Sequence, residues 1–346
     1  MQGMPDRLTR RQALKVAGLA ACSLAFRPPP PLLADGPVGL GRVAREWINL
    51  YSEPNFRARR LNIIARDTLI SLLAEETPES GPVYNPLWFH VPDGYVHSGN
   101  LQLVRWNPQT PLENVPGEEA LFEVSVPYTR SFRAADPASA PIYRLYYQST
   151  HWVEASVVGS DGRRWYRVVD DRLRVRYHVR AEHLRLIPHE EMTPISPEVP
   201  VGAKRIELSL ARQEVIAFEN EREVLRARVS TGVPSSGPTP NGIPTTTPSG
   251  RFHIDIKTPL RHMGDGGVTS DLEAYELPGV PWVAFFHSTG VAFHGTYWHT
   301  DFGRPRSHGC VNMRTDEARW LYRWTHPLAE PGQTLAIGRG TLVVVS

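Results

Sequence analysis

Four side chains with catalytic potential lie within seventeen residues near the end of the chain: His294, His299, His308 and Cys310. Cys310 stands in the segment FGRPRSHGCVNMR, residues 302–314, and no other cysteine follows the first few dozen residues. A cysteine in such a setting can be a small buried residue, a zinc ligand beside the histidines, or a nucleophile.

The residues around Cys310 separate these three interpretations. Ser307, Gly309 and Asn312 are small or polar, whereas a buried core would surround a cysteine with aliphatic residues. No spacing between histidine and cysteine matches a paired zinc-ligand motif, and no acidic residue stands as a general base beside paired histidines. We therefore predict a nucleophile and neither a metal nor another cofactor. Tightly held zinc with chelator-sensitive activity would favour the alternative, a zinc hydrolase.

A thiol nucleophile needs a base and donors for an oxyanion. His294 ends the apolar run GVAFHG, where a strand would hold its imidazole rigidly. Gly309 lets the backbone turn tightly, so that the amides of His308, Gly309 and Cys310 could face a developing negative oxygen.

The elements that would position these groups begin at Lys204, where longer alternating strands replace the earlier short ones. The runs RFHIDIK, WVAFFH, GVAFHG and TLVVVS predict further strands. The run 315–324 predicts one helix, with Thr315 or Asp316 as its N-terminal cap. Residues 257–281 are rich in Gly and Pro and predict an irregular lid.

Two strings carry a family resemblance: His294-Gly295-Thr296, and then Ser307-His308-Gly309-Cys310-Val311-Asn312. Together they resemble the signature of YkuD-type L,D-transpeptidases, the cysteine enzymes that cross-link bacterial peptidoglycan. The resemblance covers residues 203–346, including TPSGRFHI, RHMGDGG and PGVPWVAFFH. The twelve residues between His294 and Ser307 make a short loop for this family.

The resemblance implies a role for each matching residue. Cys310 would be the nucleophile, His294 the proton acceptor and donor, and the Gly295 carbonyl the group that orients His294. The residues expected to form the oxyanion hole and to fix the motif loop are His308, Gly309, Ser307 and Asn312.

Further residues are expected to contact substrate. Arg314 suits a substrate carboxylate, and a surface ion pair is its alternative. The remaining candidates could equally pack their loops: Tyr297, Trp298 and His299 between the motif halves, and Met263 and Tyr275 in the lid.

The activity implied by the resemblance is a two-step acyl transfer without a metal or nucleotide. Cys310 would attack a stem tetrapeptide, release its terminal D-alanine and pass the acyl group to a neighbouring stem, giving a 3-3 cross-link. Water could resolve the thioester instead, giving an L,D-carboxypeptidase, as could a lysine of an anchored protein. A rival from another class is an inactive scaffold that binds the cell wall.

The preceding sequence predicts two small β modules. The strings NLYSEP, LWF and GYVHS resemble SH3-like modules, which we assign to residues 37–112, and a second small β module is expected over 113–190. Residues 191–202 would be a linker, followed by the catalytic domain at 203–346. These modules could bind cell-wall material or serve as spacers.

The amino-terminal residues 1–36 predict export. Arg10 and Arg11 precede a short apolar run and resemble the twin-arginine signal, with a plain secretory leader or an amphipathic helix as alternatives. Leu19-Ala20-Ala21-Cys22 resembles a lipobox, so Cys22 would carry a lipid anchor at the cell envelope. The alternative is cleavage near Ala34.

The overall composition agrees with an exported globular protein. The chain has 346 residues, a formal net charge of +2 and 41% hydrophobic residues, which suit several soluble domains. This charge balance predicts no nucleic-acid partner. The expected partners are therefore peptidoglycan stem peptides, and we expect a monomer.

Overall fold

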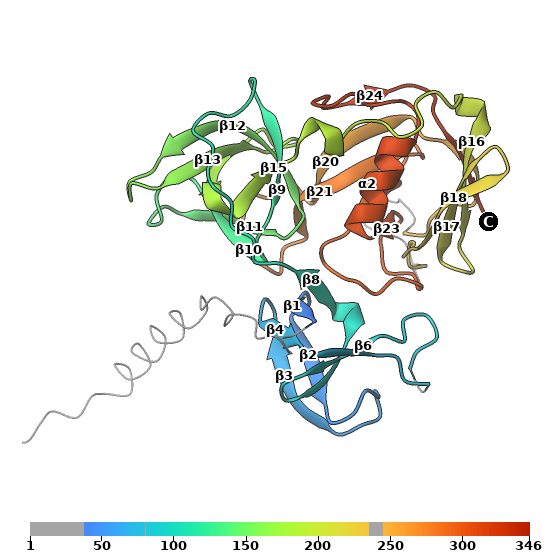
Figure 1. Cartoon of the computed structure of the whole chain (residues 1–346), viewed down its shortest axis with the longest axis horizontal. Helices are drawn as coiled ribbons and strands as arrows, with labels where there is room; N and C mark the ends of the chain where they lie inside the picture. Colours follow the sequence, from blue (N-terminus) through green and yellow to red (C-terminus); the bar gives the residue numbers. More distant parts are fainter. Residues whose placement is uncertain (1–37, 80, 235–244) are drawn as a thin grey trace, which may run out of the picture. The chain divides into compact units, whose positions relative to one another are not determined.

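A computed structural model of the chain describes residues 38–79, 81–234 and 245–346. The predicted export segment, with Arg10, Arg11 and Cys22, lies outside the described residues. The described part is mostly β-structure with one α-helix, as the sequence predicts (Figure 1).

Residues 39–104 form a first β module with two small sheets, in the strand orders β4-β1-β8 and β3-β2-β7-β6-β5. Its core includes Val43, Leu50, Phe89 and Val96. The strands are β1 (Gly39–Val43), β2 (Trp47–Tyr51), β3 (Arg60–Ala65), β4 (Leu69–Leu72), β5 (Ala74–Glu76), β6 (Trp88–Val91), β7 (Gly94–His97) and β8 (Leu101–Val104), with the 3-10 turn η2 (Ser98–Asn100) before β8. The SH3-like assignment of this module stays a prediction.

Residues 120–186 form a second β module, one sheet in the order β11-β10-β14-β13-β12-β9-β15. Phe122, Leu145, Tyr166 and Val179 lie in its core. The strands are β9 (Ala120–Val124), β10 (Tyr128–Phe132), β11 (Pro141–Tyr146), β12 (Thr150–Val158), β13 (Arg164–Val169), β14 (Arg176–Arg180) and β15 (Leu184–Leu186), and the 3-10 turns η3 (Ala181–His183), η4 (His189–Glu191) and η5 (Val201–Ala203) follow β14 in the chain.

The remaining chain forms two five-stranded sheets, β18-β17-β16-β25-β19 and β23-β22-β21-β20-β24. The first contains β16 (Lys204–Ser209), β17 (Glu214–Glu219), β18 (Arg222–Arg228), β19 (Gly250–His253) and β25 (Leu342–Val345). The second contains β20 (Ile256–Gly264), β21 (Glu276–Phe285), β22 (Ala292–Gly295), β23 (Val311–Met313) and β24 (Ala336–Ile337). Most neighbouring strands in the two sheets pair antiparallel, whereas β16 and β25 pair in parallel, as do β22 and β23.

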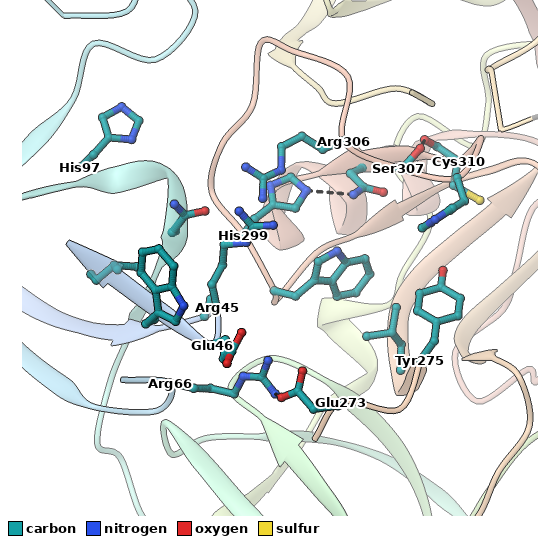
Figure 2. Close-up of a pocket in the computed structure, with 18 of the residues that line it drawn as sticks. Arg45, Glu46, Arg66, His97, Glu273, Tyr275, His299, Arg306, Ser307 and Cys310 are labelled. Carbon is teal, nitrogen blue, oxygen red and sulfur yellow. Dashed lines mark hydrogen bonds and ion pairs between the residues drawn. The ribbon is translucent and has the colours of Figure 1, made fainter. Parts of the chain in front are cut away.

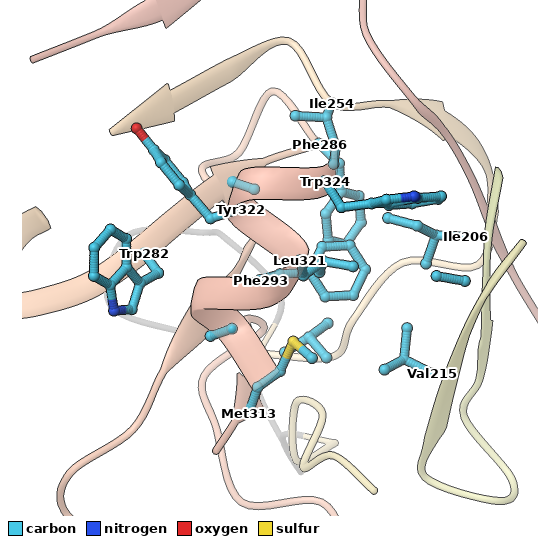
Figure 3. Close-up of a cluster of buried hydrophobic side chains, with 14 of the residues drawn as sticks. Ile206, Val215, Ile254, Trp282, Phe286, Phe293, Met313, Leu321, Tyr322 and Trp324 are labelled. Carbon is cyan, nitrogen blue, oxygen red and sulfur yellow. The ribbon is translucent and has the colours of Figure 1, made fainter. Parts of the chain in front are cut away.

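Helix α2 (Thr315–Trp324) packs on β21 and β22, and its apolar side is buried between the two sheets (Figure 3). Leu321 and Trp324 meet Ile206 and Val215 there. The predicted cap was wrong: the N-cap residue is Arg314, without a side-chain capping bond. Because β23 ends at Met313, the chain enters the helix directly and Thr315 already lies in its first turn.

Two buried lysines hold the other end of α2. Lys204 donates to the Trp324 carbonyl at 2.8 Å, and Lys257 donates to the carbonyls of Tyr322 and Thr325 at 2.7 Å each. The last carbonyls of a helix lack partners within it, and cations there also complement the helix dipole. These lysines therefore fix the helix that follows the Cys310 segment.

The predicted lid is shorter in the structure than in the sequence-based prediction. Residues 257–264 and 276–281 belong to the long strands β20 and β21, so only residues 265–275 are irregular. The β20–β21 ladder has a register shift between Arg261 and Met263, opposite Pro278 and Gly279 of β21. Bulges of this kind allow proline where a regular strand would not.

Candidate active site

His294 lies in β22, and Cys310 directly precedes the neighbouring parallel strand β23. In the β22–β23 pair, Phe293 lies opposite Val311 and His294 opposite Asn312, and Cys310 directly precedes β23. The two halves of the sequence motif, separated by twelve residues, are thus brought together at the edge of one sheet.

The His294 imidazole is buried and oriented by the backbone. Its Nδ1 lies 3.0 Å from the Gly295 carbonyl oxygen, which requires Nδ1 to donate and leaves Nε2 unprotonated. Burial lowers the pKa of His294 to about 4, against the opposing effect of the Gly295 bond. The imidazole is therefore neutral near pH 7, in the tautomer that can accept a proton at Nε2.

The Cys310 thiol is half-buried and packs against Val280, Val283 and Ala292. Its Sγ lies 3.7 Å from the Gly290 carbonyl oxygen, to which the thiol donates. Burial raises the pKa of Cys310 to about 11, while a hydrogen bond from the Ala292 backbone lowers it. The resting pair is thus a thiol and a neutral imidazole rather than a thiolate and an imidazolium.

The segment before Cys310 is held by short hydrogen bonds. The Ser307 hydroxyl donates to the Cys310 carbonyl at 2.5 Å and accepts from the Gly309 N–H at 3.1 Å. Thr247 donates to the Gly309 carbonyl at 2.6 Å. Gly309 has φ +123°, a conformation that strains residues with a β-carbon.

These bonds bear on the predicted oxyanion hole. Because the Gly309 N–H already donates to Ser307, the amides of His308 and Cys310 are the better placed donors in this state. The assignment of an oxyanion role to each amide stays a prediction.

Asn312 and His299 form a buried pair beside the thiol. Asn312 Nδ2 and His299 Nε2 are 2.9 Å apart, and His299 Nδ1 accepts from the Asp301 N–H at 3.1 Å. Burial lowers the pKa of His299 to about 3, and the positive charge of Arg306 makes a smaller contribution in the same direction. Since neutral His299 then carries its proton on Nε2, the chemically consistent Asn312 rotamer turns Oδ1 toward it.

A cleft of about 840 Å³ opens beside these residues (Figure 2). It gathers most of the predicted site: Cys310, His294, Ser307, His308, Asn312, Trp298, His299, Met263 and Tyr275. The Tyr275 ring lies 5.4 Å from the His308 ring, between centroids. Burial raises the pKa of the Tyr275 hydroxyl, and the electrostatic effect of Cys310 adds to the increase. The hydroxyl therefore stays protonated.

Two predicted substrate residues do not line this cleft. Tyr297 is buried, and its hydroxyl donates to the Pro278 carbonyl at 3.0 Å, which matches the loop-packing alternative. Arg314 faces a different cavity, with its guanidinium 5.3 Å from the Phe302 ring centroid and 3.9 Å from a Glu317 carboxylate oxygen. This geometry matches the ion-pair alternative for Arg314.

The first β module holds the loop between the motif halves. Arg42, buried in β1, donates to the Tyr297 carbonyl at 3.0 Å. The Thr300 hydroxyl lies 2.7 Å from the Ser98 carbonyl oxygen and 2.8 Å from that of Leu101. The module therefore positions residues 297–300 from outside the catalytic sheet.

The second β module holds the lid through a buried histidine. His262 Nδ1 lies 2.5 Å from Asp170 Oδ2, and its Nε2 lies 2.7 Å from Glu276 Oε2. Burial alone would lower the pKa of His262, but the bonds and charges of both carboxylates raise it. Glu276 also accepts from the Gly267 N–H, so this cluster latches residues 265–275 at both ends.

Two features are absent from residues 38–79, 81–234 and 245–346. No group of three or more His, Cys, Asp or Glu side chains in this part of the chain is arranged to hold a metal ion. Within the same residues, no helix has the length and apolar character needed to cross a membrane.

With this geometry in view, comparisons with known proteins identify the class of the catalytic segment. The family model described as "YkuD: L,D-transpeptidase catalytic domain" matches residues 203–345. Residues 203–345 therefore form a YkuD-type L,D-transpeptidase catalytic domain, as the sequence motifs predict. No protein with curated function matches the chain.

Several solved structures of L,D-transpeptidases are similar to this chain. The protein from Xylanimonas cellulosilytica is 23% identical, with 42% of this chain and 60% of that chain covered and a TM-score of 0.31. L,D-transpeptidase 3 from Mycobacterium tuberculosis is 18% identical, with 42% and 61% covered and a TM-score of 0.30. The Mycobacterium smegmatis enzyme is 17% identical, with 53% and 90% covered and a TM-score of 0.31. The match thus spans about 60% of the length of the first two relatives.

The structure adds cleft residues that sequence reasoning missed. Arg45, Trp47 and Phe56 of the first module line the cleft, as does Arg306 of the motif loop. The first three precede Cys310 by about 250 residues, and no spacing rule connects them to it. Arg306 directly precedes the motif residue Ser307, and this proximity was a usable signal.

Proposed function

We propose that this protein is an extracytoplasmic peptidoglycan L,D-transpeptidase that works through a thioester on Cys310. The observation that carries the proposal is the presentation of Cys310 and neutral His294 by adjacent strands in one cleft, within a segment that matches the YkuD catalytic domain. The substrates would be peptidoglycan stem peptides.

The first step is formation of the acyl-enzyme. As a stem peptide enters, the Cys310 thiol turns from the Gly290 carbonyl and transfers its proton to His294 Nε2 while sulfur attacks the carbonyl carbon that precedes the terminal D-alanine. The carbonyl oxygen becomes an oxyanion, which the amides of His308 and Cys310 stabilise. The intermediate then breaks its C–N bond, and the leaving D-alanine amine takes the proton from His294.

The second step transfers the acyl group. A side-chain amine on the third residue of a neighbouring stem loses a proton to His294 and attacks the thioester carbonyl. The C–S bond breaks, the thiolate regains its proton from His294, and a 3-3 cross-link remains. Water in place of the amine would give L,D-carboxypeptidase activity, and a lysine of an anchored protein would give protein attachment.

The resting protonation states fit concerted base catalysis. With a thiol pKa of about 11 and an imidazole pKa of about 4, an ion pair is strongly disfavoured before substrate binds. The neutral base next to a protonated thiol favours proton transfer during attack, as in other thiol and hydroxyl nucleophiles activated by an adjacent base. The unreactive resting thiol would also resist oxidation outside the cytoplasm.

The location follows from the proposed activity and the leader. We propose export by the amino-terminal segment and, if Cys22 is lipidated, attachment to the envelope membrane. We further propose that the active protein is a monomer.

The test is a covalent adduct. Purified protein is incubated with defined tetrapeptide stems, and its mass is followed with time. We expect a mass increase equal to the tripeptide acyl group, located on Cys310 by peptide mapping and absent in Cys310→Ala. Cys310→Ala that retains full activity would contradict the thioester mechanism. Defined acceptor stems then separate cross-linked product from hydrolysed tripeptide.

A further inference from the structure

The cleft extends from the thiol to a wall made by the first β module. Arg45, Trp47, Asn49 and Tyr51 line it from β2 and the residues just before β2, and Phe56 lines it from the following loop. Trp47 and Phe56 are about half exposed. A substrate reaching Cys310 through this cleft therefore has the first module as one of its contact surfaces.

Arg45 stands out among the charged residues of that wall. It is exposed, and within residues 38–79, 81–234 and 245–346 no hydrogen bond or ion pair engages its guanidinium. Its neighbour Glu46 also lines the cleft, and no ion pair joins the two side chains. Glu273, the other acidic residue of the cleft, pairs with Arg66 at 3.0 Å. The positive charge of Arg45 thus lacks a protein counter-ion.

A second guanidinium, that of Arg306, lines the same cleft from the motif loop. Arg306, which precedes Ser307, has a side chain only 13% exposed, and its Nη1 lies 2.5 Å from Asp301 Oδ2. Figure 2 labels Arg45 and Arg306 among the residues that line this cleft. Burial lowers the pKa of Arg306, and the positive charges of Arg45 and Arg304 act in the same direction, against the carboxylate of Asp301.

The local charge balance favours an anion. Asp301 must serve both Arg304 and Arg306, so two guanidinium groups share one carboxylate, and Arg45 adds a further positive charge that acts on Arg306. Like charges at a partly buried site repel each other, and a bound anion offsets this repulsion because it attracts each guanidinium group. Guanidinium groups match a carboxylate particularly well because each presents parallel N–H donors.

We propose that Arg45 and Arg306 together bind a carboxylate of the peptide acyl donor, so that the first β module contributes directly to substrate selection. This inference rests on the proposed function, since it takes a stem peptide as the occupant of the cleft. It also replaces Arg314, which faces another cavity, as the site of carboxylate recognition. Arg45 would determine specificity without taking part in the chemistry at Cys310.

The experiment compares the whole protein with Arg45→Gln, Arg45→Lys and a control, Arg57→Gln. Arg57 is an exposed arginine of the same module that does not line the cleft, so the control removes the same charge elsewhere. Acylation of Cys310 is measured by mass spectrometry with no acceptor present, using a tetrapeptide donor and a set of donors in which each carboxylate is amidated in turn. Arg306 is left intact because it also holds Asp301.

We expect Arg45→Gln to raise the KM for the fully acidic donor about tenfold with little change in kcat, the size expected from loss of one charge-assisted hydrogen bond. Arg45→Lys should recover part of the loss, and Arg57→Gln should behave as the unaltered protein. With one of the amidated donors, the difference between Arg45→Gln and the unaltered protein should disappear, which identifies the carboxylate.

Two outcomes would overturn the inference: Arg45→Gln acylated as efficiently as the unaltered protein, or a defect that persists equally with every amidated donor. Failure of the proposed function gives a different result, because then the unaltered protein would form no adduct on Cys310 with any stem peptide. The two failures are therefore distinguishable in one set of measurements.

Discussion

Two buried histidines in the catalytic domain, His294 and His262, differ in charge because they differ in partners. His294 has a backbone carbonyl at Nδ1, and burial holds its pKa near 4. His262 is equally buried, but Asp170 and Glu276 face its two nitrogens and raise its pKa. Burial alone therefore does not predict protonation. The neutral imidazole can act as a base, whereas the charged one can act only as a clamp.

The comparison is tested most strongly by removing the base. His294→Gln should lower kcat/KM for acylation of Cys310 about 1,000-fold, because the thiol would lose its proton acceptor while the hydrogen-bonding amide preserves the local packing. Single-turnover mass spectrometry measures the rate, and circular dichroism checks the fold. A loss smaller than tenfold would mean that another group takes the proton.

Removing the clamp should affect stability instead. His262→Gln leaves Asp170 and Glu276 buried without their cation, so the free energy of unfolding should fall by about 3 kcal/mol. Denaturant unfolding measures this, with His189→Gln as a control at an exposed histidine. The acylation rate per folded molecule should fall far less than in His294→Gln. Equal losses of activity in the two variants would erase the functional distinction between these histidines.

The two sites should also respond to pH in opposite directions. His294 has a lowered pKa, so its contribution to stability is present above pH 6.5 and is lost as pH falls from 6.5 toward 4. His262 has a raised pKa, so its contribution is present below pH 6.5 and is lost as pH rises through its folded-state value. Unfolding free energies of the unaltered protein and both glutamine variants across this range measure each contribution.

The same difference predicts the shape of the activity profile. Because His294 must be neutral to accept a proton, kcat/KM for acylation should fall on the acid side near pH 4 rather than near 6.5. Measurement of acylation from pH 3.5 to 8 locates this limb. A midpoint near 6.5 would show that the imidazole is not desolvated in the working site.

The smallest changes in stability and activity are expected for substitution of a third buried histidine, His299. His299 is neutral like His294 but bonds Asn312 rather than a proton-transfer partner. His299→Leu should lower the free energy of unfolding by about 1 kcal/mol, since it leaves the buried Asn312 amide without this bond. The acylation rate should change by only a few-fold. A loss as large as that of His294→Gln would give His299 a part in the proton transfer.

The sequence predicted most of what local patterns can encode. Alternating apolar residues indicated the strands, the run 315–324 indicated α2, and the two-part motif around His294 and Cys310 indicated a shared site. These features depend on residues near one another in the chain or on a recurrent motif. The predicted lid over 257–281 was too long. Much of this Gly- and Pro-rich sequence pairs in β20 and β21, and the ladder contains a bulge.

The remaining features depend on contacts between distant segments. Nothing around Arg45 indicates that it lines a cleft with Cys310, and nothing around Asp170 indicates that it faces His262. Arg314 shows that proximity in sequence can also mislead. Its position next to the motif suggested a substrate contact, but at the start of α2 its side chain lies near Glu317. Tertiary packing determines which distant residues come into contact, and these contacts cannot be inferred from local patterns in one sequence.

The contacts of Arg42 and Thr300 have a consequence for rearranging this protein. A catalytic segment cut free at residue 203 would retain Cys310 and His294 but lose the supports at the Tyr297 carbonyl and the Thr300 hydroxyl. A chimaera with a foreign amino-terminal half would have the same deficit unless the new half supplied matching donors and acceptors. The natural unit for transplantation is therefore the catalytic domain together with both β modules, since the second module supplies Asp170 to the His262 cluster.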